Sequence, residues 1–382
     1  MAGEKGTLGI LGDRLRIDMS EKIAELNPNK NPLTVLTKKM KRTRTVYNPE
    51  YDWMEQDIGA RWDALDGNGS AIGASTTKLV FHQDSYFRVG DILKIPSTGE
   101  TMLVTAVNPD GNNTKEYTVT RSWGTTAAAQ VPDDTPVVCI GNVNAEGATL
   151  REIKQTEPVK KTNYTQIFRT PVGVTGTLQA TKTYGPKPLS WYRHLAGIEH
   201  AVDMERAFLF GEKAKDTTGP QPKRSTGGVL EFCTENIFDV SKTTLTEQSF
   251  VEWLEDVFRY GSSEKILFAS ARLCTHIDLW ALGKLRTLPG EKTYGVAVKE
   301  YISTHGKLYV VKHHLLEGAT YGGYGIVLDM DYVSYCPLDT RDTKLLTNRQ
   351  ANDEDAQKDE YLTEAGIEVR LPKTHAVIKG VA

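Results

Sequence analysis

The chain has 382 residues, of which 39% are hydrophobic and 25% are charged. These fractions are ordinary for a globular protein and exclude wholesale disorder, a collagen-like rod and a long coiled coil. The length allows two or three domains. With 46 Lys and Arg against 49 Asp and Glu, the net charge is -3, so no overall basic field marks a dedicated nucleic-acid-binding protein.

The four cysteines, Cys139, Cys233, Cys274 and Cys336, lie far apart and have no metal-binding spacing. Four cysteines in a chain of this length do not make a disulfide scaffold, so we expect buried thiols in a reducing compartment. The N-terminus lacks the apolar core of a signal peptide, and no apolar run reaches the roughly 18 residues that a membrane span requires. The sequence therefore predicts synthesis and folding in the cytoplasm.

Residues 1–50 have too few apolar side chains for a core of their own and predict an arm. A short amphipathic piece, Ile17–Leu26, is followed by Pro28 and Pro32, which break a helix. Further along, five of the seven residues in Lys38–Arg44 are cationic. Such a run is either a solvated loop or face, or a local patch that contacts a polyanion or an acidic partner.

Residues 78–142 are rich in strand signals. Turn residues at Ser97–Glu100 and Asn108–Asn112 separate apolar runs that have the length and composition of strands. The predicted strands are Lys78–His82, Asp91–Ile95, Thr101–Val107, Tyr117–Arg121 and Val137–Ile140. We expect antiparallel hairpins or a small barrel. Loop-like residues on both sides, Asp66–Ser70 and 141–147, indicate an insertion or an extended arm.

The strongest helix signal covers residues 187–215, with Pro188 in the first turn. Its large apolar side chains recur at helical spacing and form one stripe. The stripe consists of Trp191, Leu195, Ile198, Val202 and Leu209. We therefore expect these residues to face a core. The residues before the helix, Tyr164–Ala180, predict a strand whose core candidates include Ile167 and Val172.

Residues 216–242 are rich in Gly, Pro and Thr and predict a long loop or a crossover between domains. Thr244 and Glu247 then have the spacing of a capping box at the start of a helix. A strand follows at Lys265–Phe268, and another helix begins at Ser270. This alternation predicts a compact α+β or α/β domain.

Strands dominate again from Tyr294 onward. The clearest are Lys307–Lys312, Gly325–Leu328 and Val333–Cys336. Residues 351–360 predict an acidic, solvated loop. The last two strands, Thr363–Leu371 and Ala376–Val381, predict a hairpin that turns at Pro372–Thr374.

The sequence contains no phosphate-binding, dinucleotide-binding, metalloprotease or nucleophile-elbow motif. His313 and His314 are adjacent on a predicted strand, so they point to opposite faces and we expect a structural role. Cys274 and His276 lie on different sides of a helix. Asp66–Ser70 predicts a turn, since the ligand spacing of an EF-hand is absent. We therefore expect no catalytic residue, no cofactor and no metal ion.

Several segments resemble one family when they are taken in chain order. They are Ile23–Pro28 with Asn31–Leu33, the hairpin Val89–Asp91 with Gly99–Val104 and Thr118–Arg121, and Ile167–Thr177 running on to the helix Glu199–Gly211. They resemble the major capsid proteins of tailed bacteriophages, and this resemblance extends in order over most of the chain. That family has the Hong Kong 97-type capsid fold, which is an α+β fold.

The resemblance implies a division of the chain into five parts. They are an N-terminal arm at 1–50, an extended loop with a β-rich insertion at 51–155, a peripheral domain at 156–229 with 187–215 as its spine helix, an axial domain at 230–340, and a return to the peripheral domain at 341–382. The β-rich block is longer than a two-stranded hairpin, so we expect a small β domain inserted in the extended loop.

The function that the resemblance implies is mechanical. Copies form hexamers and pentamers, close an icosahedral shell and enclose double-stranded DNA, within a virion assembled in the cytoplasm of the bacterial host. The implied partners are other copies of the chain, a separate scaffolding protein, a portal, non-specifically bound DNA and a decoration protein, with no membrane. Candidate contacts with neighbours or DNA are Lys38, Lys39, Lys41, Arg42, Arg44, Arg121 and Arg169.

Two other functions stay open at this point. A nanocompartment shell of the encapsulin kind shares the fold and encloses proteins in place of DNA. A cytosolic α/β enzyme with an unrecognised site would contain a pocket with convergent titratable residues. Terminase and portal genes nearby would indicate a phage, and a cargo-enzyme gene would indicate a compartment.

Overall fold

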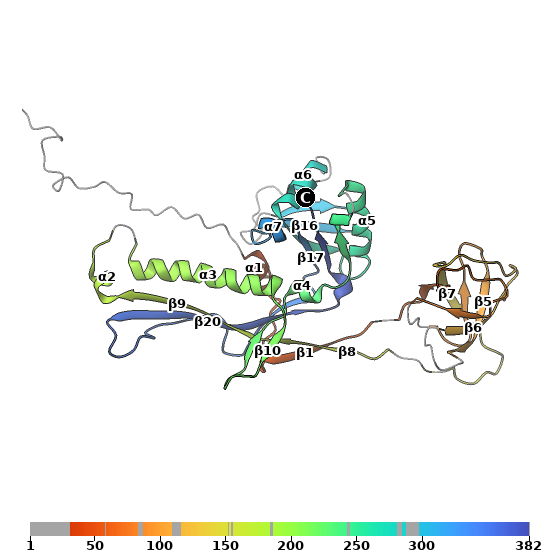
Figure 1. Ribbon diagram of the computed structural model, residues 1–382, viewed down its shortest axis with the longest axis horizontal. Helices are drawn as coiled ribbons and strands as arrows, with labels where there is room; N and C mark the ends of the chain where they lie inside the picture. Colours follow the sequence, from red (N-terminus) through yellow and green to blue (C-terminus); the bar gives the residue numbers. More distant parts are fainter. Residues whose placement is uncertain are drawn as a thin grey trace, which may run out of the picture. The chain divides into compact units, whose positions relative to one another are not determined.

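A computed structural model describes residues 31–57, 59–82, 87–108, 116–151, 153, 156–183, 186–242, 245–280, 285–287 and 298–381. The chain divides into two compact units (Figure 1). We call residues 54–160 the barrel unit and the remainder the main unit. The predicted amphipathic piece Ile17–Leu26 lies outside the described residues. No helix in the described part of the chain is long and apolar enough to cross a membrane.

The barrel unit is an antiparallel sheet with the strand order β2-β7-β4-β5-β6-β3. Its strands are β2 (Trp62–Ala64), β3 (Lys78–Val80), β4 (Asp91–Lys94), β5 (Thr101–Val107), β6 (Glu116–Thr120) and β7 (Pro136–Asn142). Leu65 pairs with Phe81 beyond the ends of β2 and β3, and the His82 N–H donates to the Ala64 carbonyl at 3.1 Å. These contacts join the two outermost strands, so the sheet closes into the small barrel that the sequence allowed.

The barrel has its own apolar core. Phe81, Phe87 and Tyr117 meet edge to face at its centre, with ring centroids 5.2 to 5.6 Å apart. Alternate residues of the strands, among them Leu93 and Val104, complete this core. Period-two alternation places one side of each strand inside, which explains why local sequence patterns predicted these strands.

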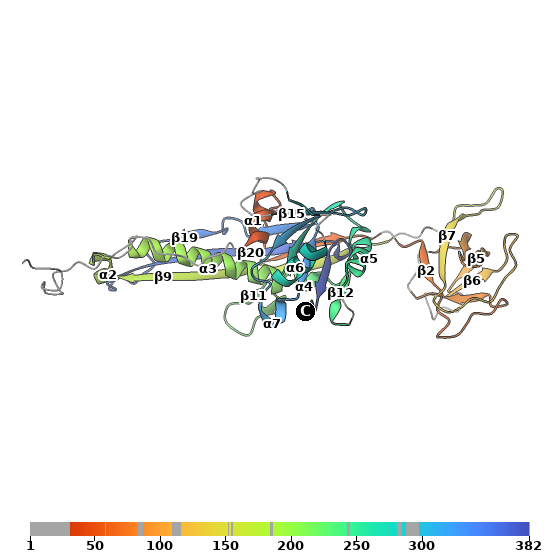
Figure 2. The same cartoon turned by 90° about the horizontal axis from the view of Figure 1, so that it is seen from above.

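The first sheet of the main unit is built around one long strand, β20 (Ala356–Val369). β18 (Val333–Pro337) and β19 (Lys344–Leu346) pair with one edge of β20, and β9 (Gln166–Thr175) pairs with the other edge. The long helix α3 (Pro188–Phe210) runs beside β9 and β20, and the short α2 (Gly176–Ala180) precedes it (Figures 1 and 2).

The second sheet of the main unit has the order β12-β21-β17-β13-β16-β15-β14. Its strands are β12 (Ile237–Asp239), β13 (Glu264–Ala269), β14 (Leu285–Thr287), β15 (Val298–Ile302), β16 (Lys307–Lys312), β17 (Gly325–Leu328) and β21 (Ala376–Lys379). Helices α5 (Glu247–Phe258) and α6 (Ala271–Trp280) share an apolar core with it through Phe250, Leu254 and Leu273. The predicted mixed α/β character of this region is confirmed.

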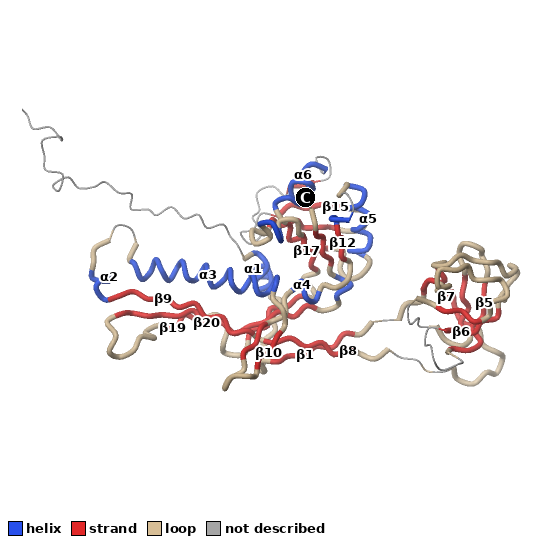
Figure 3. Tube along the Cα trace, in the orientation of Figure 1, coloured by secondary structure: helices blue, strands red, loops and turns tan. Residues whose placement is uncertain are grey.

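The remaining elements are short (Figure 3). Helix α1 (Pro32–Lys39) packs Leu33 and Leu36 into the same core as Phe208 and Tyr335. Strands β1 (Glu50–Glu55) and β8 (Val159–Tyr164) form one ribbon, and β10 (Ala214–Asp216) and β11 (Lys223–Ser225) form another. Helices α4 (Val229–Phe232) and α7 (Gly318–Tyr321) each make about one turn.

The predicted helix 187–215 is five residues too long at its C-terminal end, since α3 ends at Phe210. At Gly211 the chain turns, and the Gly228 N–H donates to the Gly211 carbonyl at 2.8 Å. A Cβ at position 211 would lie 2.6 Å from the Thr226 carbonyl oxygen, closer than side chains come in proteins. Glycine therefore permits the close return of the chain that ends the helix.

The predicted C-terminal hairpin is wrong. Residues Pro372–Thr374 form a 3₁₀ turn, but β20 and β21 belong to different sheets. The turn thus carries the chain from one sheet of the main unit to the other. The acidic loop predicted at 351–360 is also too long, because β20 begins at Ala356.

The helix that begins near residue 247 is capped by a different pair from the predicted one. The Thr246 hydroxyl accepts from the Ser249 N–H at 3.1 Å, and the Ser249 hydroxyl accepts from the Thr246 N–H at 3.0 Å. Thr244 lies outside the described residues, and Glu247 is the first residue of α5. The capping box is present two residues later than the spacing of Thr244 and Glu247 suggested.

Candidate intersubunit and nucleic-acid contacts

Three of the five predicted cations in Lys38–Arg44 pair with carboxylates of their own chain. Lys38 Nζ lies 3.5 Å from Asp342 Oδ1, Arg42 pairs with Asp331, and Arg44 Nη1 lies 2.6 Å from Glu368 Oε2. The segment runs beside β18, where Thr43 and Val46 form parallel bridges to Tyr335 and Leu338. This stretch is therefore fastened to the main unit. Lys38, Lys39, Lys41 and Arg44 are nevertheless exposed, and their contact with a neighbour or DNA stays a prediction.

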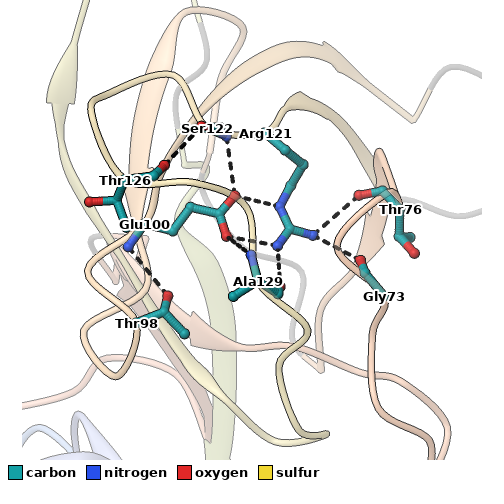
Figure 4. A network of polar contacts seen from close by, with 8 residues as sticks. All are labelled: Gly73, Thr76, Thr98, Glu100, Arg121, Ser122, Thr126 and Ala129. Carbon is teal, nitrogen blue, oxygen red and sulfur yellow. Dashed lines mark hydrogen bonds and ion pairs between the residues drawn. The ribbon is translucent and has the colours of Figure 1, made fainter.

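The side chain of Arg121 is only 6% exposed and is engaged within the barrel unit, which does not favour its predicted contact with a neighbour or DNA. Its guanidinium forms a bidentate pair with Glu100, with Nε 2.6 Å from Oε1 and Nη2 2.8 Å from Oε2 (Figure 4). It also donates to the carbonyls of Gly73 and Ala129. Burial raises the pKa of the Glu100 carboxyl, but the hydrogen bonds from Arg121 and the Ser122 N–H lower it by more. The pKa of Glu100 therefore lies below its usual value. The pair joins three loops of the barrel unit.

Arg169 lies on β9 and stays accessible, with 57% of its side chain exposed. Its Nη2 donates to Glu360 Oε2 at 2.8 Å, and this bond lowers the pKa of the Glu360 carboxyl. Arg169 is the direct partner of Leu362 on β20, so its side chain reaches Glu360 diagonally and joins β9 to β20. Contact of Arg169 with another subunit stays a prediction.

The face of α3 that packs inward differs from the predicted one. Of the expected core stripe, only Leu209 is fully buried, and Trp191, Leu195, Ile198 and Val202 are half-buried. The buried residues are Ala196, His200, Met204, Glu205, Phe208 and Leu209. His200 bonds to Thr170 at 3.0 Å and to Thr363 at 2.7 Å, and burial lowers its pKa. Ala196 and His200 therefore face the sheet. A prediction that selects the largest apolar side chains as the core face of the helix misses both residues.

Glu205 is a structural centre that the sequence did not reveal. Its carboxylate accepts from the backbone N–H groups of Leu33 at 2.6 Å and Thr34 at 2.8 Å, and from the Thr34 hydroxyl. It also meets His313 Nε2 at 3.0 Å. An acidic group satisfies the free N–H groups at a helix start. Because Asn31 makes no side-chain cap, Glu205 caps α1 from a distant part of the chain.

One group in the barrel unit has the composition of a metal site. Asp66, His82 and Asp133 have ligand atoms within 4.8 Å of one another. Asp133, however, accepts from the N–H groups of Gly67 and Gly69, each at 2.6 Å. These bonds shape the turn predicted at Asp66–Ser70, and we assign no ion to the group.

Strand β1 and the stretch between β7 and β8 expose large apolar side chains. Leu150 is 86% exposed, and Met54 and Ile153 are each 71% exposed. Val159, on β8, is also exposed. Such side chains are costly to leave in water, and their concentration on the two strands and the stretch that lead to and from the barrel is typical of surfaces that another molecule covers.

Structural comparison defines the class of protein. The fold is similar to that of the capsid protein of cyanophage P-SCSP1u, with a TM-score of 0.51, 10% identity and 99% coverage of both chains. It is also similar to the capsid protein of a native GTA particle, with a TM-score of 0.50, 11% identity and 98% coverage of both chains. The fold is that of the Hong Kong 97-type capsid proteins.

Sequence comparison then identifies the family. A family model described as SU10 major capsid protein matches residues 4–382, and the chain belongs to that family. A major capsid protein of Pseudomonas phage PaMx41 is 25% identical over 336 residues, which cover 81% of this chain and 79% of the relative. These findings support a tailed-phage capsid over the compartment shell and the cytosolic enzyme, and the protein is a component of the virion.

Proposed function

We propose that this chain builds the phage shell from hexamers and pentamers in the host cytoplasm, in a structural role without catalysis. The exposed apolar residues Met54, Leu150 and Ile153 carry this proposal. A single copy gains nothing from placing them in water, whereas neighbouring copies in a closed shell can cover them. The barrel's extended connections thus supply the contacts that bind one copy to the next.

Packaged DNA is the second partner that we propose. The barrel unit holds 14 Asp and Glu against nine Lys and Arg, so it repels DNA as a whole. In the main unit, the run Lys38–Arg44 at the end of α1 carries exposed cations, among them Lys41 and Arg44. A few such cations, binding phosphates without reading bases, are sufficient for a container. A separate scaffolding protein, a portal and a decoration protein complete the proposed partners.

Electron microscopy of the purified protein, alone and with its candidate scaffold, tests this function. We expect closed shells or rings of five or six copies, and double-stranded DNA in native particles. A Leu150→Ser/Ile153→Ser variant should assemble poorly, whereas the control Trp123→Ser, at an exposed residue elsewhere in the barrel unit, should assemble normally. A uniform monomer in every condition would contradict the proposal. Particles filled with protein in place of nucleic acid would indicate a compartment.

A further inference from the structure

The part of the first sheet formed by β9 and β20 is covered by α3 on one face only (Figure 1). Phe168 on β9 and its direct partner Thr363 on β20 contact side chains of α3. Successive residues of a strand point to opposite faces, so their neighbours Arg169 and Leu362 lie on the second face. Every residue that β9 places on that second face is exposed, namely Ile167, Arg169, Pro171, Gly173 and Thr175. The second face is therefore open to solvent along β9.

This second face carries five cations. Lys344 on β19 and Arg169 on β9 are both direct partners of Leu362, so the three residues form one row across the sheet. Lys358 lies four residues before Leu362 on β20 and therefore on the same face. Two arginines are joined to the face by the carboxylates beneath it. We call the five cations the basic face: Arg169, Arg341, Lys344, Arg349 and Lys358.

The carboxylates of the basic face lie beneath its cations. The side chains of Glu360 and Glu364 are 10% and 6% exposed, whereas their partners Arg169 and Arg341 are 57% and 42% exposed. Arg349 acts on the same Glu360 carboxyl and helps to lower its pKa. The groups that the face presents to solvent are therefore cationic.

The free groups of the basic face suit phosphate oxygens. Arg169 donates from Nε and Nη2 to Glu360, which orients the guanidinium and leaves its Nη1 without a bond to a described residue. A guanidinium fixed in this way binds a phosphate with little further loss of freedom. Lys344 is exposed and forms no ion pair with a described residue. Glu354, which pairs with Lys358, brings the count to five cations against three carboxylates.

The composition of the basic face favours nucleic acid over a second copy of the chain. The centres of protein–protein interfaces are depleted of charged residues, whereas DNA interfaces are polar and strongly positive. Ile167 is the one large apolar side chain that the described part of this face exposes. The rows from Lys358 to Glu364 span about 20 Å of strand, along which one DNA strand presents about six phosphates. The cations thus match one side of a duplex.

We propose that the basic face binds the phosphate backbone of the packaged double-stranded DNA. This inference rests on the proposed capsid function and adds a second surface to the cationic run Lys38–Arg44. A flat sheet face touches phosphates without entering a groove, so the contact reads no base sequence. Its strength depends on the release of counterions from the DNA and falls as the salt concentration rises.

Duplex binding by the full-length, unassembled subunit tests the contact. The probe is a fluorescein-labelled duplex of about 30 base pairs, and fluorescence anisotropy gives Kd between about 50 and 200 mM salt. Lys344→Gln/Arg349→Gln removes two cations that form no ion pair with a described residue, so the fold should be kept. Each lost phosphate contact lowers the slope of log Kd against log salt by about 0.9. We expect a slope smaller by about 1.8 and binding about tenfold weaker at the lower salt.

Lys223→Gln/Arg272→Gln is the matched control, because it removes two exposed cations of the main unit from β11 and α6. The control should change Kd by less than about twofold and leave the slope as in wild type. Equal weakening by the two double variants, or a wild-type subunit that does not bind the duplex, overturns the inference. The capsid function still stands in either case if electron microscopy shows closed shells.

Shell closure by the same variant separates DNA from a protein partner. We expect Lys344→Gln/Arg349→Gln to close shells as wild type does, because the basic face meets DNA and not a neighbouring subunit. A variant that binds the duplex as tightly as wild type but fails to close shells would overturn the inference. That result would assign the basic face to a contact between subunits.

Discussion

Glu205 and His313 lie 108 residues apart in the sequence and meet through a 3.0 Å hydrogen bond in the interior of the main unit. The same carboxylate caps α1 through Leu33 and Thr34. One side chain thus joins the long helix α3, the segment after β16 and the first described helix of the chain. The position of α1, and of whatever precedes it, depends on this carboxylate.

Replacing this carboxylate tests its role as a cap. Glu205→Ala leaves buried N–H groups and His313 without their acceptor, so we expect a loss of about 3 kcal/mol in the free energy of unfolding. Urea unfolding of the unassembled subunit measures it. Glu199→Ala, at an exposed position of the same helix, should change stability by less than about 0.5 kcal/mol. Equal effects of the two variants would contradict the role.

We expect the protonation of His375 to make the free energy of unfolding depend on pH in the acidic range. Burial lowers the pKa of His375 to about 4, and its ring accepts from the Asp329 N–H at 3.2 Å and bonds to the Arg370 carbonyl at 3.0 Å. In the unfolded chain a histidine has a pKa of about 6.5. Between pH 6.5 and 4 the unfolded state therefore binds more protons, and the free energy of unfolding falls by about 3 kcal/mol as the pH is lowered.

A His375→Gln variant should lose most of this slope, while His305→Gln, at an exposed position, should retain it. Thermal unfolding at a series of pH values compares the two variants with wild type. Parallel profiles for all three proteins would show that another group causes the acid sensitivity.

Lys265, on β13 of the second sheet, anchors the end of α5 through hydrogen bonds. Its buried ammonium donates to the carbonyls of Val257, Tyr260 and Thr374 at 2.6 to 2.7 Å. Lys265→Met keeps the volume but leaves three acceptors unsatisfied, so we expect a loss of about 3 kcal/mol. Lys307→Met, which removes a half-exposed ion pair with Glu264, should cost about 0.5 kcal/mol. Similar losses at both positions, measured by urea unfolding, would be inconsistent with this account.

The Glu100–Arg121 pair should be essential to the barrel unit only as a pair. Arg121→Met leaves a buried, uncompensated carboxylate and should destabilise the barrel unit by about 3–5 kcal/mol. Adding Glu100→Gln removes that charge and should recover part of the loss. Hydrogen exchange of the barrel strands measures both, with Arg61→Met as an exposed control. A double variant less stable than Arg121→Met alone would contradict the expected coupling.

Two N-terminal deletions should separate assembly from folding. Removing residues 1–44 deletes α1 and its buried Leu33 and Leu36, so the subunit itself should lose several kcal/mol of stability. Removing residues 1–30 leaves α1 in place, so the subunit should unfold as wild type does while closing shells less efficiently. Thermal unfolding followed by circular dichroism measures the stability of the subunit, and electron microscopy measures shell closure. Normal shells from the shorter protein would exclude an arm function for residues 1–30.

Local patterns predicted the fold more accurately than the contacts. The barrel strands alternate with a period of two and are separated by turn residues, so both signals lie within a few residues of each strand. The end of α3 depended on the return of Thr226–Gly228, and the separation of β20 from β21 depended on which sheet β21 joins. These are tertiary contacts, for which the sequence near 211 or 372 contains no signal.

For the candidate contact residues, too, local features could be predicted from the sequence and tertiary partners could not. A cationic run is visible in the sequence, but the carboxylates that pair with it, Asp331, Asp342 and Glu368, come from the last quarter of the chain. The sequence around Arg121 does not indicate burial, because its partner Glu100 comes next to it only in the folded barrel. Glu205 carried no sequence signal because its partners are 171 and 108 residues away.

The pairing of β1 with β8 has a consequence for engineering and for evolution. The chain enters and leaves the barrel unit through two neighbouring strands, and the barrel has a complete core of its own. A closed module attached at one point can be exchanged for another of different size without re-routing any strand of the main unit. A foreign domain grafted between β1 and β8 would be carried once per subunit, which makes this junction a natural attachment point for regularly spaced cargo or antigens.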